Sequence, residues 1–148
     1  MKRPVLLAGL GASLAINAYR TLKFLDFSIT VEDDYDPLCS LSHELRFIMG
    51  NNTLEEFKLY VSIKDEMPFE TESVDWSAAL DSVLTESGAF LMLHRVSVEI
   101  HWFSEYMDLD GMKFVMENLK KGKFPRLVES KALEFNFNSR VVSLLTLL

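Results

Sequence analysis

Apolar residues recur along the chain with one spacing, L-x-x-L-x-F-x-I, which first appears at Leu22. The spacing returns 32 residues later and again 39 residues after that. A weaker fourth copy has Ser130 in place of its first apolar residue. A spacing that returns every 20–50 residues or so is typical of repeat architectures. The copies are Leu22, Leu25, Phe27 and Ile29; Leu54, Phe57, Leu59 and Val61; Leu93, Val96, Val98 and Ile100; and Leu133, Phe135 and Phe137.

Each copy ends in strict alternation of apolar residues with polar ones. This period of two, in segments rich in β-branched and aromatic residues, predicts a strand with one buried face. The other face of each strand is polar and should meet solvent or a partner. Its residues are Asp26, Ser28 and Thr30; Lys58, Tyr60 and Ser62; Ser97, Glu99 and His101; and Glu134, Asn136 and Asn138.

Between the copies, the apolar spacing changes to that of helices. The first predicted helix has Asp36 as N-cap and Pro37 as its first residue, and ends at Gly50. The second runs from Asp75 to Gly88, and the third from Asp108 to Gly122, with Pro125 beyond it. Their apolar faces carry Leu38, Leu41, Leu45, Ile48 and Met49; Trp76, Leu80, Val83 and Leu84; and Leu109, Met112, Val115, Met116 and Leu119.

Alternating strands and helices imply parallel strands joined by helical crossovers. Such a chain can form an open α/β sheet with helices on both faces, or a solenoid with helices on one side. Central strands of a doubly wound sheet are apolar on both faces, whereas these strands alternate. We therefore predict an α/β fold: a short leucine-rich-repeat-like solenoid over residues 21–148, with about four parallel strands and helices on one side.

Residues 1–20 form a separate apolar segment with two interpretations. Lys2 and Arg3 precede an apolar run from Val5 to Ile16, and cleavage after Ala18 would fit a secretory signal peptide. The alternative is an ordinary buried helix that packs under the first strand. The run is too short for a stable membrane span. The glycosylation sequon at Asn51 would matter only in a secreted chain.

The segment from about Thr21 to Phe137 resembles the repeat region of F-box-associated leucine-rich-repeat proteins of mushroom-forming fungi. The carrying segments are LCSLSHELRFIMGNNTLEEFKLYV, DWSAALDSVLTESGAFLMLHRVSVEI and KFPRLVESKALEFNF. The consensus Asn position holds Thr30, Ser62 and His101, and Asn138 in the fourth copy. We expect no F-box in the residues given before the repeats, because they are too few to hold one. The resemblance implies a substrate-recognition part related to ubiquitin ligases, without the part that docks to the ligase.

Composition and charge narrow the function classes. The chain has 148 residues and a net charge of −7, so no basic face for nucleic acid is expected. The lone cysteine, Cys39, rules out an internal disulfide and a zinc site of paired cysteines. No nucleophile elbow, HExxH motif or glycine-rich phosphate loop occurs, so we expect no catalytic residue, metal or cofactor.

The repeat spacing predicts which polar residues lie side by side on the strand face. One predicted row is Asp26, Lys58, Ser97 and Glu134, and the next is Ser28, Tyr60, Glu99 and Asn136. We select Tyr60, Glu99 and His101 as the candidate binding residues, because Tyr60 offers contact area and the other two offer directional contacts. A cluster of aromatic residues is predicted where the chain leaves the third strand. It consists of His101, Trp102, Phe103 and Tyr106.

These features favour a non-enzymatic module that binds a protein partner on its strand face, in the cytoplasm or nucleus. One alternative is a secreted fungal protein acting outside the cell, and another is a small α/β enzyme of unknown reaction. The last eight residues, VVSLLTLL, are nearly all apolar. Because solenoid ends expose core, we also expect self-association through the ends.

Overall fold

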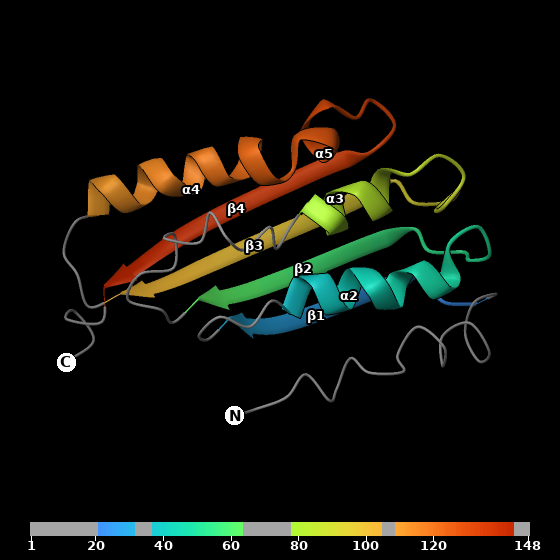
Figure 1. Ribbon diagram of the computed structural model, residues 1–148, viewed down its shortest axis with the longest axis horizontal. Coiled ribbons are helices and arrows are strands. Elements are labelled where there is room, and N and C mark those ends of the chain that lie inside the picture. Colours follow the sequence, from blue (N-terminus) through green and yellow to red (C-terminus); the bar gives the residue numbers. More distant parts are fainter. Residues whose placement is uncertain (1–20, 32–36, 64–77, 105–108, 144–148) are drawn as a thin grey trace.

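The computed structural model describes residues 21–31, 37–63, 78–104 and 109–143, which form one parallel sheet with helices packed on it (Figure 1). The strands are β1 (Phe24–Val31), β2 (Glu56–Ile63), β3 (Arg95–Ser104) and β4 (Glu134–Ser143). They lie side by side in sequence order, and each neighbouring pair is parallel. The prediction of an α/β fold with four parallel strands is confirmed.

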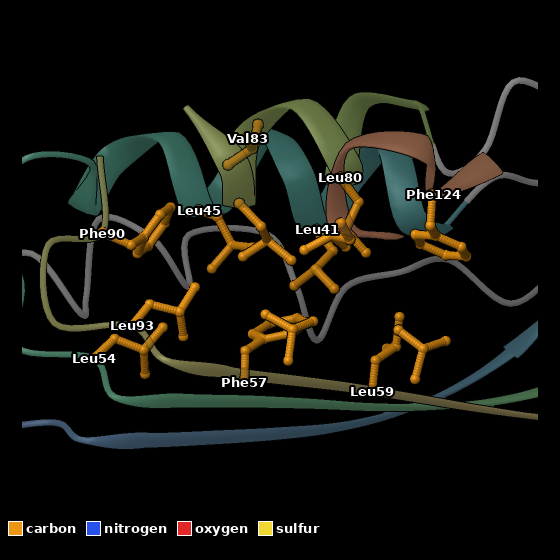
Figure 2. Packing of buried hydrophobic residues seen from close by; sticks show 14 of the residues in the cluster. Leu41, Leu45, Leu54, Phe57, Leu59, Leu80, Val83, Phe90, Leu93 and Phe124 are labelled. Atoms are coloured by element: carbon orange, nitrogen blue, oxygen red, sulfur yellow. The ribbon is translucent and has the colours of Figure 1, made fainter. Parts of the chain in front are cut away.

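The helices form a second layer above the sheet. They are α2 (Pro37–Leu45), the 3₁₀ helix η1 (Arg46–Ile48), α3 (Ala78–Thr85), α4 (Leu109–Lys123) and α5 (Pro125–Glu129). Figure 2 shows α2, α3 and α5 on the same side of the strands, with the labelled apolar side chains between the two layers. The predicted caps Asp36, Asp75 and Asp108, together with Trp76, lie outside the described residues.

The core follows the alternation along the strands. On β2, Phe57, Leu59 and Val61 are at most 1% exposed, while Lys58 between them is exposed. From the helix layer, Leu41 and Leu80 meet these residues and are fully buried. Burying side chains of this size stabilises a fold by about 1.5–3 kcal/mol each, so this layer contact holds the sheet and helices together.

Two glycines lie in the turns between helix and strand, with φ of +76° at Gly50 and +78° at Gly88. These left-handed angles suit glycine, which has no Cβ to clash. The helices end before them, α2 at Leu45 and α3 at Thr85. The predicted helix ends at Gly50 and Gly88 were therefore too late, because a 3₁₀ turn or a loop separates each helix from its glycine.

The chain forms a helix, α5, that the sequence pattern did not predict. We expected Pro125 to mark the end of helical structure after Gly122, but α4 continues to Lys123 and Pro125 begins α5. Proline is tolerated at a first helical position because the N–H it lacks would have no partner within the helix. The same residue that stops one helix therefore starts the next.

The predicted rows are correct for β1, β2 and β3 and wrong for β4. Asn136, not Glu134, lies beside Ser97, and Asn138, not Asn136, lies beside Glu99. Arg140 therefore takes the position beside His101 that was assigned to Asn138. A shift of two residues keeps the same side chains on the buried face, so the apolar pattern could not detect the error.

The predicted aromatic group after the third strand is divided between two faces, because β3 continues to Ser104. Trp102 is 6% exposed and belongs to the core, whereas His101 and Phe103 lie on the polar face. Alternation within the longer strand is the physical reason for this division. Tyr106 lies outside the described residues.

The two ends of the chain are only partly described. Val141, Val142 and Ser143 from the apolar tail belong to β4, and residues 144–148 lie outside the described part. The helix or signal peptide expected in residues 1–20 also lies outside it. No helix in the described ranges is long and apolar enough to cross a membrane.

Candidate functional site

The strand residues that point away from the helices form a surface that we call the open face. Most of its polar side chains are exposed, and α2, α3 and α5 pack on the opposite side of the sheet (Figure 2). Ser62 is buried, and five residues are half-buried: Glu56, Tyr60, Ser97, Phe103 and His101, whose side chain is 19% exposed. The open face consists of Phe24, Asp26, Ser28 and Thr30; Glu56, Lys58, Tyr60 and Ser62; Arg95, Ser97, Glu99, His101 and Phe103; and Glu134, Asn136, Asn138 and Arg140.

The structure brings the three candidate binding residues together in one hydrogen-bonded chain. The Tyr60 hydroxyl lies 3.1 Å from Nδ1 of His101, and Nε2 of His101 lies 3.2 Å from Oε1 of Glu99. The Tyr60 and His101 rings meet edge to face, with centroids 4.8 Å apart. His101 therefore links a phenol on β2 to a carboxylate on its own strand, and both of its ring nitrogens are used.

Strand register explains why these residues meet. Tyr60 and Glu99 occupy paired positions of β2 and β3, and His101 follows Glu99 by two residues on the same face. His101 also pairs in register with Arg140 on β4 and Ser62 on β2. The chain of hydrogen bonds is thus built on rigid strands rather than on loops.

A second polar group lies at the amino-terminal ends of the strands, and the sequence analysis did not select it. Arg95 donates hydrogen bonds to Glu56 (3.1 Å) and to Glu134 (2.6 Å). The hydrogen bond and charge of Glu134, with the charge of Glu56, raise the pKa of Arg95. The correct register of β4 would have revealed this group, because it places Glu134 beside Arg95.

Next to this group the open face is slightly hollowed. The depression has a volume of about 250 Å³ and is lined in part by Lys58, Ser97 and Asn136, together with the ion-paired residues. It lies toward the amino-terminal half of the strands. In open α/β sheets, by contrast, ligands bind outside the carboxyl ends of the strands.

Asp81 is a buried carboxylate whose role is structural. It is 3% exposed and accepts hydrogen bonds from the backbone N–H groups of Leu127 (2.9 Å) and Arg126 (3.1 Å). Burial raises the pKa of Asp81, although these two hydrogen bonds and the charge of Arg126 oppose the shift. The carboxylate caps the start of α5 from the neighbouring helix α3.

No three histidine, cysteine or acidic side chains in the described ranges lie close enough together to hold a metal ion. Comparisons with models of protein families, with curated proteins and with solved structures find no significant match. The structure shows a mixed α/β protein with a four-stranded parallel sheet. The function of its open face is therefore inferred from the side chains on that face.

Proposed function

We propose that this protein is a non-enzymatic protein-recognition module that binds its partner on the open face. One observation carries the proposal: polar side chains of all four strands lie on one rigid surface, most of them exposed, while the apolar side chains of the core lie under the helices. Extended strand faces of this kind suit protein partners because they are wide and pre-ordered.

We further propose that the fold is a short leucine-rich-repeat-like solenoid. Equivalent backbone hydrogen bonds join successive units: Glu56 donates to Lys23, Arg95 to Glu55, and Glu134 to His94. Sequential parallel strands with helices on one side support the same interpretation. Each unit would bury its apolar face against the next, as in repeat proteins.

The resemblance to F-box-associated leucine-rich-repeat proteins extends the proposal to the kind of partner. In this account, the open face holds a substrate that a separate ligase component modifies with ubiquitin. The module would then act in the cytoplasm or nucleus. This part of the proposal rests on the resemblance and not on a catalytic or docking feature of the chain.

The two ends of the sheet support self-association as a second kind of contact. Leu25 and Phe27 on β1, and Phe135 and Phe137 on β4, are only partly buried against the core. Pairing β4 of one copy with β1 of another would cover these side chains and continue the sheet. The contact would be head to tail.

The binding proposal is tested by removing side chains from the open face. We expect Tyr60→Ala and Glu99→Ala each to weaken partner binding about tenfold, which is equivalent to about 1.4 kcal/mol. Glu117→Ala is the matched control, because Glu117 is an exposed acidic residue on α4, in the helix layer. Partners that are captured equally by all three variants would contradict the open face as the binding surface.

A further inference from the structure

We propose that the depression on the open face binds the carboxylate side chain of an aspartate or glutamate of the partner, through Lys58, Ser97 and Asn136. The inference rests on the proposed function, because it names the chemical group that a protein partner places there. It follows from a difference in hydrogen bonding between successive rows of side chains on the open face.

The polar groups on both sides of this row are already hydrogen-bonded among themselves. Toward the amino-terminal ends of the strands, the guanidinium of Arg95 donates to two carboxylates. Toward the carboxyl ends, His101 links Tyr60 to Glu99. Groups that bind each other must exchange these bonds for bonds to a partner, so they contribute little net affinity.

The row between these two groups has no such internal bonds. Lys58, Ser97 and Asn136 are paired in register on β2, β3 and β4, and all three line the depression. None of their side chains forms a hydrogen bond or an ion pair with another residue in the described ranges. A partner can therefore bind these three side chains without displacing a contact among described residues.

The donors of this row select the chemistry of the group that binds. The ammonium of Lys58 can only donate, and the Ser97 hydroxyl and the Asn136 amide can each donate as well. A carboxylate accepts through two oxygens and can take a hydrogen bond from all three. A neutral amide lacks the charge that strengthens the bond to an ammonium, and a partner cation is repelled by Lys58.

The charges around the depression favour a group with one negative charge. Its lining carries two cations and two carboxylates, and Arg95 binds both carboxylates, Glu56 and Glu134. Lys58 is the other cation, and it forms no ion pair within the described ranges, not even with Asp26 beside it on β1. A phosphate group, with a charge of about −2, would meet more repulsion from the nearby carboxylates.

The size of the depression favours one side chain of a protein over a free small molecule. Its volume of about 250 Å³ is below the range of roughly 300–1,000 Å³ that is usual for small-molecule pockets. Lys58 and Ser97 lie on the two central strands, and contacts near the centre of an interface contribute most to affinity. The net charge of −7 does not attract an acidic protein over long distances. The acidic side chain is therefore held at short range, while the rest of the open face binds the partner around it.

The test is an NMR titration of the uniformly ¹⁵N-labelled full chain with two probes. One is the peptide acetyl-Gly-Glu-Gly-amide, and the other replaces glutamate by glutamine, which has nearly the same shape without the charge. We expect the glutamate peptide to shift the backbone amide signal of Ser97 and the side-chain amide signals of Asn136 to saturation. The glutamine peptide should bind about tenfold more weakly.

Variants separate the charge of the site from its shape. Lys58→Gln should weaken binding of the glutamate peptide about tenfold, because it removes the cation. Ser97→Val should weaken it by about tenfold or more, because the larger side chain fills the depression. Valine is favoured in strands, so the second variant should keep its fold, which its melting temperature checks. Lys113→Gln on α4 is the control, because Lys113 is an exposed lysine in the helix layer, and it should bind like the wild type.

Equal binding of the two peptides, or wild-type binding by Lys58→Gln, would overturn the inference. The proposed function fails in a different way. If the glutamate peptide binds as described but Tyr60→Ala, Glu99→Ala and Ser97→Val all capture the protein partner normally, the carboxylate site stands and the recognition function fails. If the first two variants lose the partner but the two peptides bind equally, only the carboxylate assignment fails.

Discussion

Among single residues, Asp81 has the most direct link to stability. Its carboxylate joins α3 to the start of α5 by accepting two backbone hydrogen bonds, one from Leu127, which is fully buried. A buried donor that loses its acceptor costs about 1–3 kcal/mol. We expect Asp81→Ala to lower the free energy of unfolding by about 2 kcal/mol, as measured by urea denaturation. A change below about 0.5 kcal/mol would contradict the capping role.

The same residue predicts a pH dependence. Burial raises the pKa of Asp81 above its ordinary value of 3.8, so the native state holds the proton more tightly than the unfolded state. The resulting stabilisation is full below that ordinary value and is lost as the pH rises through the raised pKa. The free energy of unfolding of the wild type, minus that of Asp81→Asn, should therefore fall from about pH 3.5 to 7. An increase over this range would show that the backbone hydrogen bonds outweigh burial.

The sequence could group Tyr60, Glu99 and His101, but it could not reveal Asp81. The first three follow from alternation within a strand and from the spacing between strands, and both are visible in the residue pattern. The partners of Asp81 are backbone groups of Arg126 and Leu127, which lie far along the chain and leave no mark on its own neighbourhood. A cap supplied by another helix is a tertiary feature, which explains why the sequence pattern did not indicate a role for Asp81.

At the scale of the elements, the backbone conformation of a glycine determines whether its replacement by alanine destabilises or stabilises the fold. Gly88 has a φ of +78° and an open space around its missing Cβ, so Gly88→Ala would add backbone strain without a steric clash. We expect a loss of about 1 kcal/mol in the free energy of unfolding. Gly122 lies in α4 and is also surrounded by open space. Gly122→Ala should stabilise by about 0.5–1 kcal/mol, because alanine has the higher helix propensity.

Thermal denaturation of the two variants gives the comparison directly. The melting temperature should fall for Gly88→Ala and rise for Gly122→Ala, relative to the wild type. Both substitutions add one methyl group, so a difference in sign reports backbone conformation rather than volume. Shifts of the same sign and size would contradict the assignment of these two positions.

The elements themselves were largely predictable, and their register was not. Period-two alternation located all four strands, because one face of each is buried. The shift of two residues in β4 left Phe135 and Phe137 on the buried face, so only specific contacts could reveal it. Those contacts are the Arg95–Glu134 ion pair and the packing of Phe135 and Phe137 against Phe124. None of them is visible in an apolar pattern.

At the scale of the whole molecule, the ends of the sheet predict concentration-dependent association. Sedimentation velocity should show a growing fraction of dimers and longer species as the protein concentration rises. Ser139→Lys places a charge on the core side of β4, at an exposed position, and should reduce this association. Glu117→Lys on α4 is the control and should associate like the wild type. A single monomeric species at all concentrations would contradict association through the ends.

The core between the two layers stabilises the molecule, and we propose that the open face of the sheet binds the partner. The face of the sheet under the helices carries the core, and the open face carries polar side chains on all four strands. Substitutions on the open face should therefore change binding while leaving the fold intact. Asn138 on β4, beside Glu99, is an exposed position on the open face. Glu117 on α4 is an exposed position on a helix.

Site-specific photo-cross-linking tests this division most directly. A photoreactive amino acid is placed at Asn138 in one protein and at Glu117 in another, and each is irradiated with the bound partner. We predict a covalent adduct from position 138 and none from position 117. An adduct from position 117 alone, or equal adducts from both positions, would contradict the open face as the recognition surface.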